Sequence, residues 1–101
     1  MADISAIMVK GFPQSPVIGS NTSVASTNTA RAGFILQNQG TNPLYVLLGT
    51  GATTSNYSVI LKGSTAANDG TGGILSFTSG ITYQGAISVA GTSPSYSFQE
   101  L

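Results

Sequence analysis

Residues 33–48 read GFILQNQGTNPLYVLL, and this stretch decides most about the fold. It contains two short apolar runs, 33–38 and 44–48, that are rich in β-branched, aromatic and long aliphatic residues. Such runs, bounded by Gly, Asn and Pro, predict β-strands. The residues between them, 39–43, include a glycine and a proline, and a loop of this length between two strands predicts an antiparallel hairpin.

Other stretches of the chain have the same character, with β-branched and aromatic residues in short runs between turn-forming residues. The runs start about 9–17 positions apart, which is typical of a sandwich or a closed barrel. No segment keeps the apolar period of a helix over three turns. We therefore expect an all-β fold, an antiparallel β-sandwich or jelly-roll-like barrel with about seven to nine short strands. The further strands are expected at residues 4–9, 17–18, 22–27, 57–62, 74–77, 82–83, 86–89 and 95–99.

The chain divides into an N-terminal segment and a main domain. Pro13 and Pro16 favour an extended connection, because proline has no N–H to donate to a sheet. We expect residues 1–20 to form an extended arm or an edge strand, and residues 21–101 to form the β-sandwich domain. Within that domain, residues 63–73 contain four glycines and are predicted to be a long polar loop.

Alternation along the strands predicts which side chains are buried, since successive residues of a strand point to opposite faces. The residues expected to face the core are Phe34 and Leu36, then Leu44, Val46 and Leu48, then Tyr57, Val59 and Leu61, then Ile87 and Val89, and finally Tyr96 and Phe98. Ile35, Leu47 and Ile60 fall on the opposite faces. They indicate either a second covered surface, such as a subunit interface, or ordinary exposed aliphatic residues.

Charge is scarce in this 101-residue chain. Charged residues make up 6% of it and balance to a formal net charge of zero, whereas soluble domains have roughly 25%. Nucleic acids and anionic membranes both attract basic surfaces, so we expect neither partner. The lack of His and Cys removes the usual zinc, copper and haem ligands, and the Ser–His and Cys–His pairs of nucleophilic catalysis. We expect a protein that is not an enzyme and that uses no cofactor or metal.

The N-terminal sequence favours a protein that is made and used without export. No stretch has the roughly 20 apolar residues that span a bilayer. Asp3 is an early acid, and no basic segment precedes an apolar run, so we expect no secretory signal.

Few residues are candidates for chemistry. Asp3, Asp69 and Glu100 are far apart in sequence, and nothing indicates a pair of the kind that glycosidases use. The glycines around Thr50 and Thr71 lack the motif of a phosphate-binding loop. Asn68-Asp69-Gly70 offers oxygen ligands for Ca²⁺ or forms a β-turn with an Asx hydrogen bond. The turn is the preferred interpretation, because one carboxylate is little for a cation that takes 6–8 oxygens.

Arg31 stands directly before the strand at 33–38 and offers five hydrogen-bond donors. One interpretation is a structural clamp on a loop carbonyl or on a chain end. The other is an ion pair between subunits. The clamp is preferred, and both remain open from the sequence.

The residues from Arg31 onward form a pattern that can be compared with known proteins. It runs Arg31-x-x-Phe34-Ile35-Leu36-Gln37-Asn38-x-Gly40-Thr41-Asn42-Pro43-Leu44-x-Val46, and later Tyr83-x-Gly85-Ala86-Ile87, Gly91-Thr92, Tyr96, Phe98 and Glu100. This pattern resembles small β-sandwich virion proteins of tailed bacteriophages, which include capsid decoration (cement) proteins. The resemblance covers residues 31–101. The chain departs from it at Leu61-Lys62-Gly63, where many of these sequences have Leu-x-Pro-Gly.

The resemblance implies a non-enzymatic virion structural protein that binds the capsid exterior and stabilises it. Its partner would be the major capsid protein, and it would act as a symmetric homo-oligomer, with a trimer favoured. It would be made in the host cytoplasm and reside on the capsid surface of the virion. Binding several capsid subunits at once would supply affinity through multivalency.

The N-terminal arm is the expected contact element, unless residues 4–9 are an ordinary edge strand of the same core. The residues expected at a capsid or subunit interface are Ile4, Ile7, Met8, Phe12 and Arg31. The alternative function is a phage tail or fibre-associated module that binds a host surface glycan. Sugars stack on exposed aromatic rings, and the chain offers Tyr45, Tyr57, Tyr83 and Tyr96 for that purpose.

Overall fold

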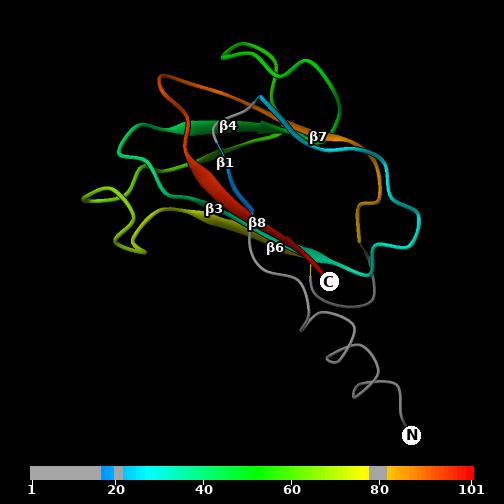
Figure 1. Ribbon diagram of the computed structural model, residues 1–101. Helices are drawn as coiled ribbons and strands as arrows, with labels where there is room; N and C mark the ends of the chain where they lie inside the picture. The colour runs from blue at the N-terminus through cyan, green and yellow to red at the C-terminus, as the bar shows by residue number, and fades with distance from the viewer. Residues whose placement is uncertain (1–16, 20–21, 78–81) are drawn as a thin grey trace, which may run out of the picture.

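The computed structural model describes residues 17–19, 22–77 and 82–101. These residues form an all-β sandwich of two four-stranded antiparallel sheets, which face each other in Figure 1. The first sheet has the strand order β1-β8-β3-β6, and the second has the order β2-β7-β4-β5. The strands are β1 (Val17–Gly19), β2 (Ser23–Ala25), β3 (Phe34–Asn38), β4 (Leu44–Leu47), β5 (Val59–Leu61), β6 (Ile74–Phe77), β7 (Ile87–Ala90) and β8 (Tyr96–Glu100). Within the described ranges, no helix is long and apolar enough to cross a membrane.

The core lies between the two sheets and contains nine buried apolar residues. Phe34 is fully buried in it, with the ring of Phe77 edge-on at 5.2 Å and the ring of Phe98 at 5.7 Å. All nine belong to the faces that strand alternation assigned to the core, so that prediction is confirmed for them. They are Phe34, Leu36, Leu44, Val46, Leu61, Ile87, Val89, Tyr96 and Phe98.

The predicted hairpin between residues 33–38 and 44–48 is wrong. β3 pairs with β6 and β8 in one sheet, whereas β4 pairs with β5 and β7 in the other. The loop of residues 39–43 therefore crosses from one sheet to the other. Its backbone is held by other segments, since Gln39 N and Gly40 N both donate to Ser95 O. Crossing allows the apolar faces of β3 and β4 to meet across the core, which pairing within one sheet would prevent.

Two further predictions are wrong. Tyr57 was expected in the core but is 42% exposed, because β5 begins only at Val59 and the alternation does not extend back to Tyr57. Thr82 and Tyr83 were expected to form a strand but do not. The carbonyl of Tyr83 accepts a hydrogen bond from the Arg31 side chain instead of entering a ladder.

The apolar residues opposite the core lie on two separate surfaces. Ile35, 37% exposed, is on the outer face of the first sheet, and Ile60, 44% exposed, is on the outer face of the second. Leu47 is half-buried and lies on the same outer face as Ile60. A single interface through all three residues is therefore excluded by the geometry of the sandwich.

Part of the predicted N-terminal segment belongs to the first sheet. β1 pairs with β8 through Val17, Ile18 and Gly19, as an edge strand. The predicted strand at residues 4–9 lies outside the described residues, so the arm remains a prediction.

Candidate functional site

Arg31 is the most connected side chain in the described residues, and it is buried. Its Nε and Nη2 each lie 2.9 Å from Glu100 Oε2. Nη1 donates to the carbonyls of Tyr83 and Gly85, and Nη2 donates to the carbonyl of Ser26, each at 3.0 Å. These three carbonyls belong to loops, so Arg31 forms the clamp on loop carbonyls that the sequence favoured.

The Arg31 clamp ties the end of β8 to three loop carbonyls that lie outside the strand ladders. Residues 26, 83 and 85 lie between strands, and Glu100 is the last residue of β8. The guanidinium carbon also lies 5.8 Å from the ring centre of Phe34 and 6.0 Å from that of Phe98. A buried guanidinium needs this degree of satisfaction, because an unpaired buried charge is strongly destabilising.

Asn38 performs a similar role at the opposite end of β3. Its Nδ2 donates to the carbonyls of Asn42, Leu61 and Lys62, and its Oδ1 accepts from Gly40 N. Gly72 passes so close that a Cβ on it would collide with the Asn38 carbonyl oxygen. Asn38 thus fixes the crossing loop, the end of β5 and the end of the 63–73 loop together.

Asn38 was not singled out from the sequence, although a signal existed. Asn38 lies two residues after Leu36 and four after Phe34 in the same strand, so alternation places its polar amide on the same buried face. A buried amide must find partners, and this one finds four.

The pattern that carries the phage resemblance therefore consists largely of fold determinants. Arg31 and Glu100 form the clamp with the Tyr83-x-Gly85 backbone, and Asn38 holds the crossing loop. These residues are buried or bonded within the chain. Within the described residues, a binding function must therefore use other surfaces of the sandwich.

Asp69 lies in a turn of the 63–73 loop, and its oxygens are occupied by loop donors. Oδ1 accepts from the backbone N–H and the hydroxyl of Thr71, and Oδ2 accepts from Ala66 N. The hydrogen bonds from Thr71 lower the pKa of the Asp69 carboxyl below its ordinary value. The turn interpretation of residues 68–70 is confirmed. Among the described residues, no three His, Cys, Asp or Glu side chains gather as metal ligands would.

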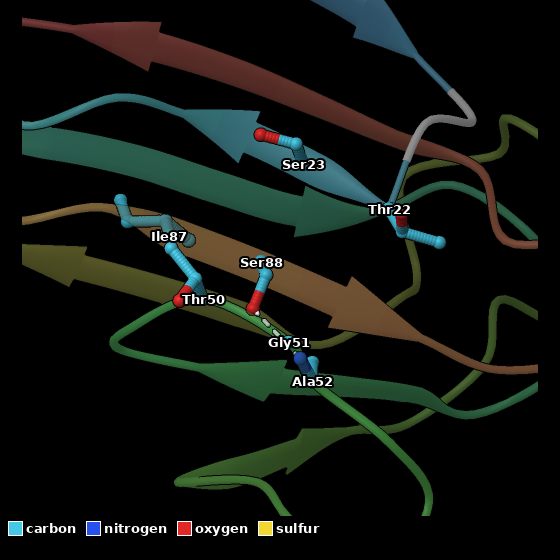
Figure 2. A pocket seen from close by; sticks show the side chains of 7 residues that line it. All are labelled: Thr22, Ser23, Thr50, Gly51, Ala52, Ile87 and Ser88. Atoms are coloured by element: carbon cyan, nitrogen blue, oxygen red, sulfur yellow. Dashed lines mark hydrogen bonds between the residues drawn. The ribbon is translucent and has the colours of Figure 1, made fainter.

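A pocket of about 170 Å³ lies between the β4–β5 loop and strands β2 and β7 (Figure 2). The hydroxyl of Ser88 donates to Gly49 O and accepts from Ala52 N, which ties the loop to β7. The lining has hydroxyl groups and no charged side chain, so it offers neither a general acid nor a general base. The lining residues are Thr22, Ser23, Thr50, Gly51, Ala52, Ile87 and Ser88.

The outer face of the second sheet carries an uncharged apolar surface, which we call the tyrosine face: Tyr45, Leu47, Tyr57 and Ile60. Tyr45 and Ile60 are directly opposite each other on β4 and β5. The rings of Tyr45 and Tyr57 meet edge to face, with centroids 5.1 Å apart. Tyr57 and Ile60 are two of the four large apolar side chains that the described residues leave exposed. This face is the strongest candidate for a binding surface.

The other sequence-predicted residues fall in different places. Ile4, Ile7, Met8 and Phe12 lie outside the described residues, so their predicted interface role remains a prediction. Arg31 is 1% exposed and could affect an interface only through the segments that it positions. Of the four tyrosines, Tyr96 is buried, which raises its pKa, and Tyr83 is partly buried. Tyr83 packs against the core, whereas the rings of Tyr45 and Tyr57 pack on each other, so these two are the candidates for stacking with a ligand.

In comparisons with protein-family models, curated proteins and solved structures, nothing matches this chain.

Proposed function

We propose that this protein is a non-enzymatic structural protein of a bacteriophage virion, which binds the capsid exterior and stabilises it as a decoration protein. The proposal rests on the tyrosine face, which is an uncharged apolar surface. The polar residues of the motif, Arg31, Asn38 and Glu100, form hydrogen bonds within the chain instead. The resemblance of residues 31–101 to phage virion proteins supports the same function.

The distribution of charge supports contacts that are mostly uncharged. Four of the six charged residues lie in the described ranges. Arg31 and Glu100 pair with each other, and Asp69 is held in its own loop. Only Lys62 is exposed without such a contact among the described residues. Charge on the described surface is therefore too sparse to supply much of the binding there, and apolar burial is the larger contribution.

In this proposal each copy contributes a modest contact, and several contacts to neighbouring capsid subunits add through multivalency. The tyrosine face supplies rigid aromatic area at low cost in conformational entropy, as tyrosines do in other interfaces. Ile4, Ile7, Met8 and Phe12 are proposed as additional anchors from the N-terminal arm. The major capsid protein is the proposed partner.

Co-sedimentation of the purified chain with empty expanded capsids of the phage that encodes it tests this function. We expect saturable binding at a stoichiometry that matches the capsid symmetry. A chain that lacks residues 1–12 tests the arm separately, and unchanged binding of that chain would remove the arm from the proposal. Absence of binding by the full chain would contradict the decoration function itself.

A glycan-binding module of a phage tail or fibre is the second candidate, and the Tyr45–Tyr57 pair favours it specifically. Exposed aromatic rings are the surfaces on which sugars stack, and Tyr57 is 42% exposed. Binding of the chain to host cells but not to capsids would support this alternative. Loss of that cell binding in Tyr57→Ala, with retention in Ile35→Ala on the other sheet, would assign it to the tyrosine face.

A further inference from the structure

Four edge strands belong to the part of the sandwich that the structure describes, and three of them carry features that discourage pairing with another chain. Short strands, prolines, lysines and bulges are the usual protection of a sheet edge. β1 has three residues and follows Pro16 in the sequence, and β5 has three residues and is followed by exposed Lys62. β2 has three residues, and its register with β7 is irregular.

β6 is different from the other three edges. It has four residues, Ile74–Phe77, with neither charge nor proline, and it pairs with β3 in a regular register over its whole length. Ile74 is 57% exposed, the highest value among the exposed large apolar residues described. A regular and apolar edge of this kind is a template for another strand.

The hydrogen-bonding pattern shows which backbone groups of β6 have no partner among the described residues, and these are called its free groups. Asn38 N donates to Gly73 O, while Gln39 N donates to Ser95 on the other side of β3. Because the two sides of a strand alternate, Leu75 and Phe77 direct their N–H and C=O groups toward β3. Ile74 and Ser76 direct theirs away from the sheet, and no described residue bonds to these groups.

We propose that β6 is the docking edge for a second copy of this chain, whose own β6 adds antiparallel to it about a two-fold axis. The two first sheets then become one continuous sheet across the pair. Ile74 of each copy lies opposite Ser76 of the other, and the two Leu75 residues face each other on the axis.

The choice of occupant and register follows from the free groups. Pairing Ile74 with Ser76 in both directions matches every free group of β6 and forms four backbone hydrogen bonds between the copies. A register that places Ile74 opposite Ile74, or Ser76 opposite Ser76, pairs the free backbone groups of only one of these two residues in each copy. The chosen register also places a large side chain opposite a small one, and no charge of either copy opposes the contact.

This inference does not depend on the capsid-binding proposal, because β6 and the tyrosine face belong to different sheets. It differs from the trimer that the phage resemblance favours, since a closed two-fold contact gives a dimer. Each dimer would carry two tyrosine faces, which is the condition for multivalent binding.

Sedimentation velocity of the full chain and of Ile74→Lys tests the docking edge. We expect the wild-type chain to be a dimer and Ile74→Lys to weaken dimerisation at least about tenfold, because an apolar contact is lost and a charge is brought to the interface. The matched control is Ile60→Lys, at a residue 44% exposed on the edge strand of the other sheet, and it should leave the dimer intact. A monomeric or trimeric wild-type chain, or equal effects of the two variants, would overturn the proposal.

Cysteine cross-linking tests the register. The chain has no cysteine, so any disulfide must join the introduced residues. Facing Leu75 residues form a non-hydrogen-bonded pair with Cα atoms about 4.5 Å apart, within the range of a disulfide. Leu75→Cys should form a disulfide-linked dimer under mild oxidation, and Ile60→Cys should not. Equal cross-linking of both, or none by Leu75→Cys, would overturn the register.

Discussion

The guanidinium of Arg31 and the carboxylate of Glu100 lie 2.9 Å apart, although the two residues are 69 positions apart in the sequence. Their contact joins the segment before β3 to the end of β8. The same guanidinium holds the backbone at Tyr83 and Gly85, where no ladder holds it. Arg31 thus ties loop positions of the chain to the end of β8, where the backbone bonds between residues 32–33 and Leu101 also hold β8 to β3.

Arg31→Met should destabilise the fold by about 3–5 kcal/mol, because it removes the buried donor of three carbonyls and leaves Glu100 without its cation. Urea unfolding followed by circular dichroism measures this change. Lys62→Met is the control, since Lys62 is exposed, and it should change stability by less than about 0.5 kcal/mol. Equal stabilities of the two variants would show that the clamp contributes nothing.

Asn38→Leu should cost about 2–3 kcal/mol. Leucine is close to asparagine in size but has no amide to donate to the carbonyls of Asn42, Leu61 and Lys62. These carbonyls lose a hydrogen-bond donor, and a buried polar group without a partner is costly. Asn42→Ala removes only an exposed bond to Thr92 O and should have a much smaller effect. Chemical denaturation of both variants makes the comparison, and a smaller loss in Asn38→Leu would refute the assigned role.

The stability of the protein should fall with acid partly through Asp69. Its folded-state pKa is lowered by Thr71, so ionised Asp69 stabilises the fold above the unfolded-state pKa of about 4. This contribution is lost as the pH falls through the lower folded-state pKa. Melting temperatures between neutral pH and about pH 2 should therefore fall less steeply in Asp69→Asn than in the wild type. An equally steep fall of the melting temperature with decreasing pH in the two proteins would argue against this role of Asp69.

The sequence predicted which residues form strands and which are buried better than it predicted which strands pair with each other. Alternation identified residues such as Phe34 and Val46 because burial of one strand face is a local property with a period of two. It failed for the connection at residues 39–43, because the choice between a hairpin and a crossing depends on distant groups such as Ser95 and Leu61. The clamp of Arg31 was anticipated from its donor capacity, whereas its partners came only from the fold. The tyrosine face was missed because Tyr57 is outside the strand to which alternation assigned it.

Capsid binding should depend on the tyrosine face and little on salt. Ile60→Ala should weaken binding about tenfold or more, since it removes apolar area from a repeated contact. Ile35→Ala is the control, because Ile35 is similarly exposed on the other sheet, and it should bind as the wild type does. Affinity should change little between about 0.05 and about 0.5 M salt. A steep salt dependence, or equal losses in both variants, would contradict an uncharged contact through this face.

Cryo-electron microscopy of empty expanded capsids with and without the protein tests the central claim most directly. The decoration function predicts added density on the capsid exterior at symmetry-related positions, with the β2-β7-β4-β5 sheet and its tyrosine face directed at the capsid. Capsids that remain bare at saturating protein, or density in which the tyrosine face is directed at solvent, would contradict it.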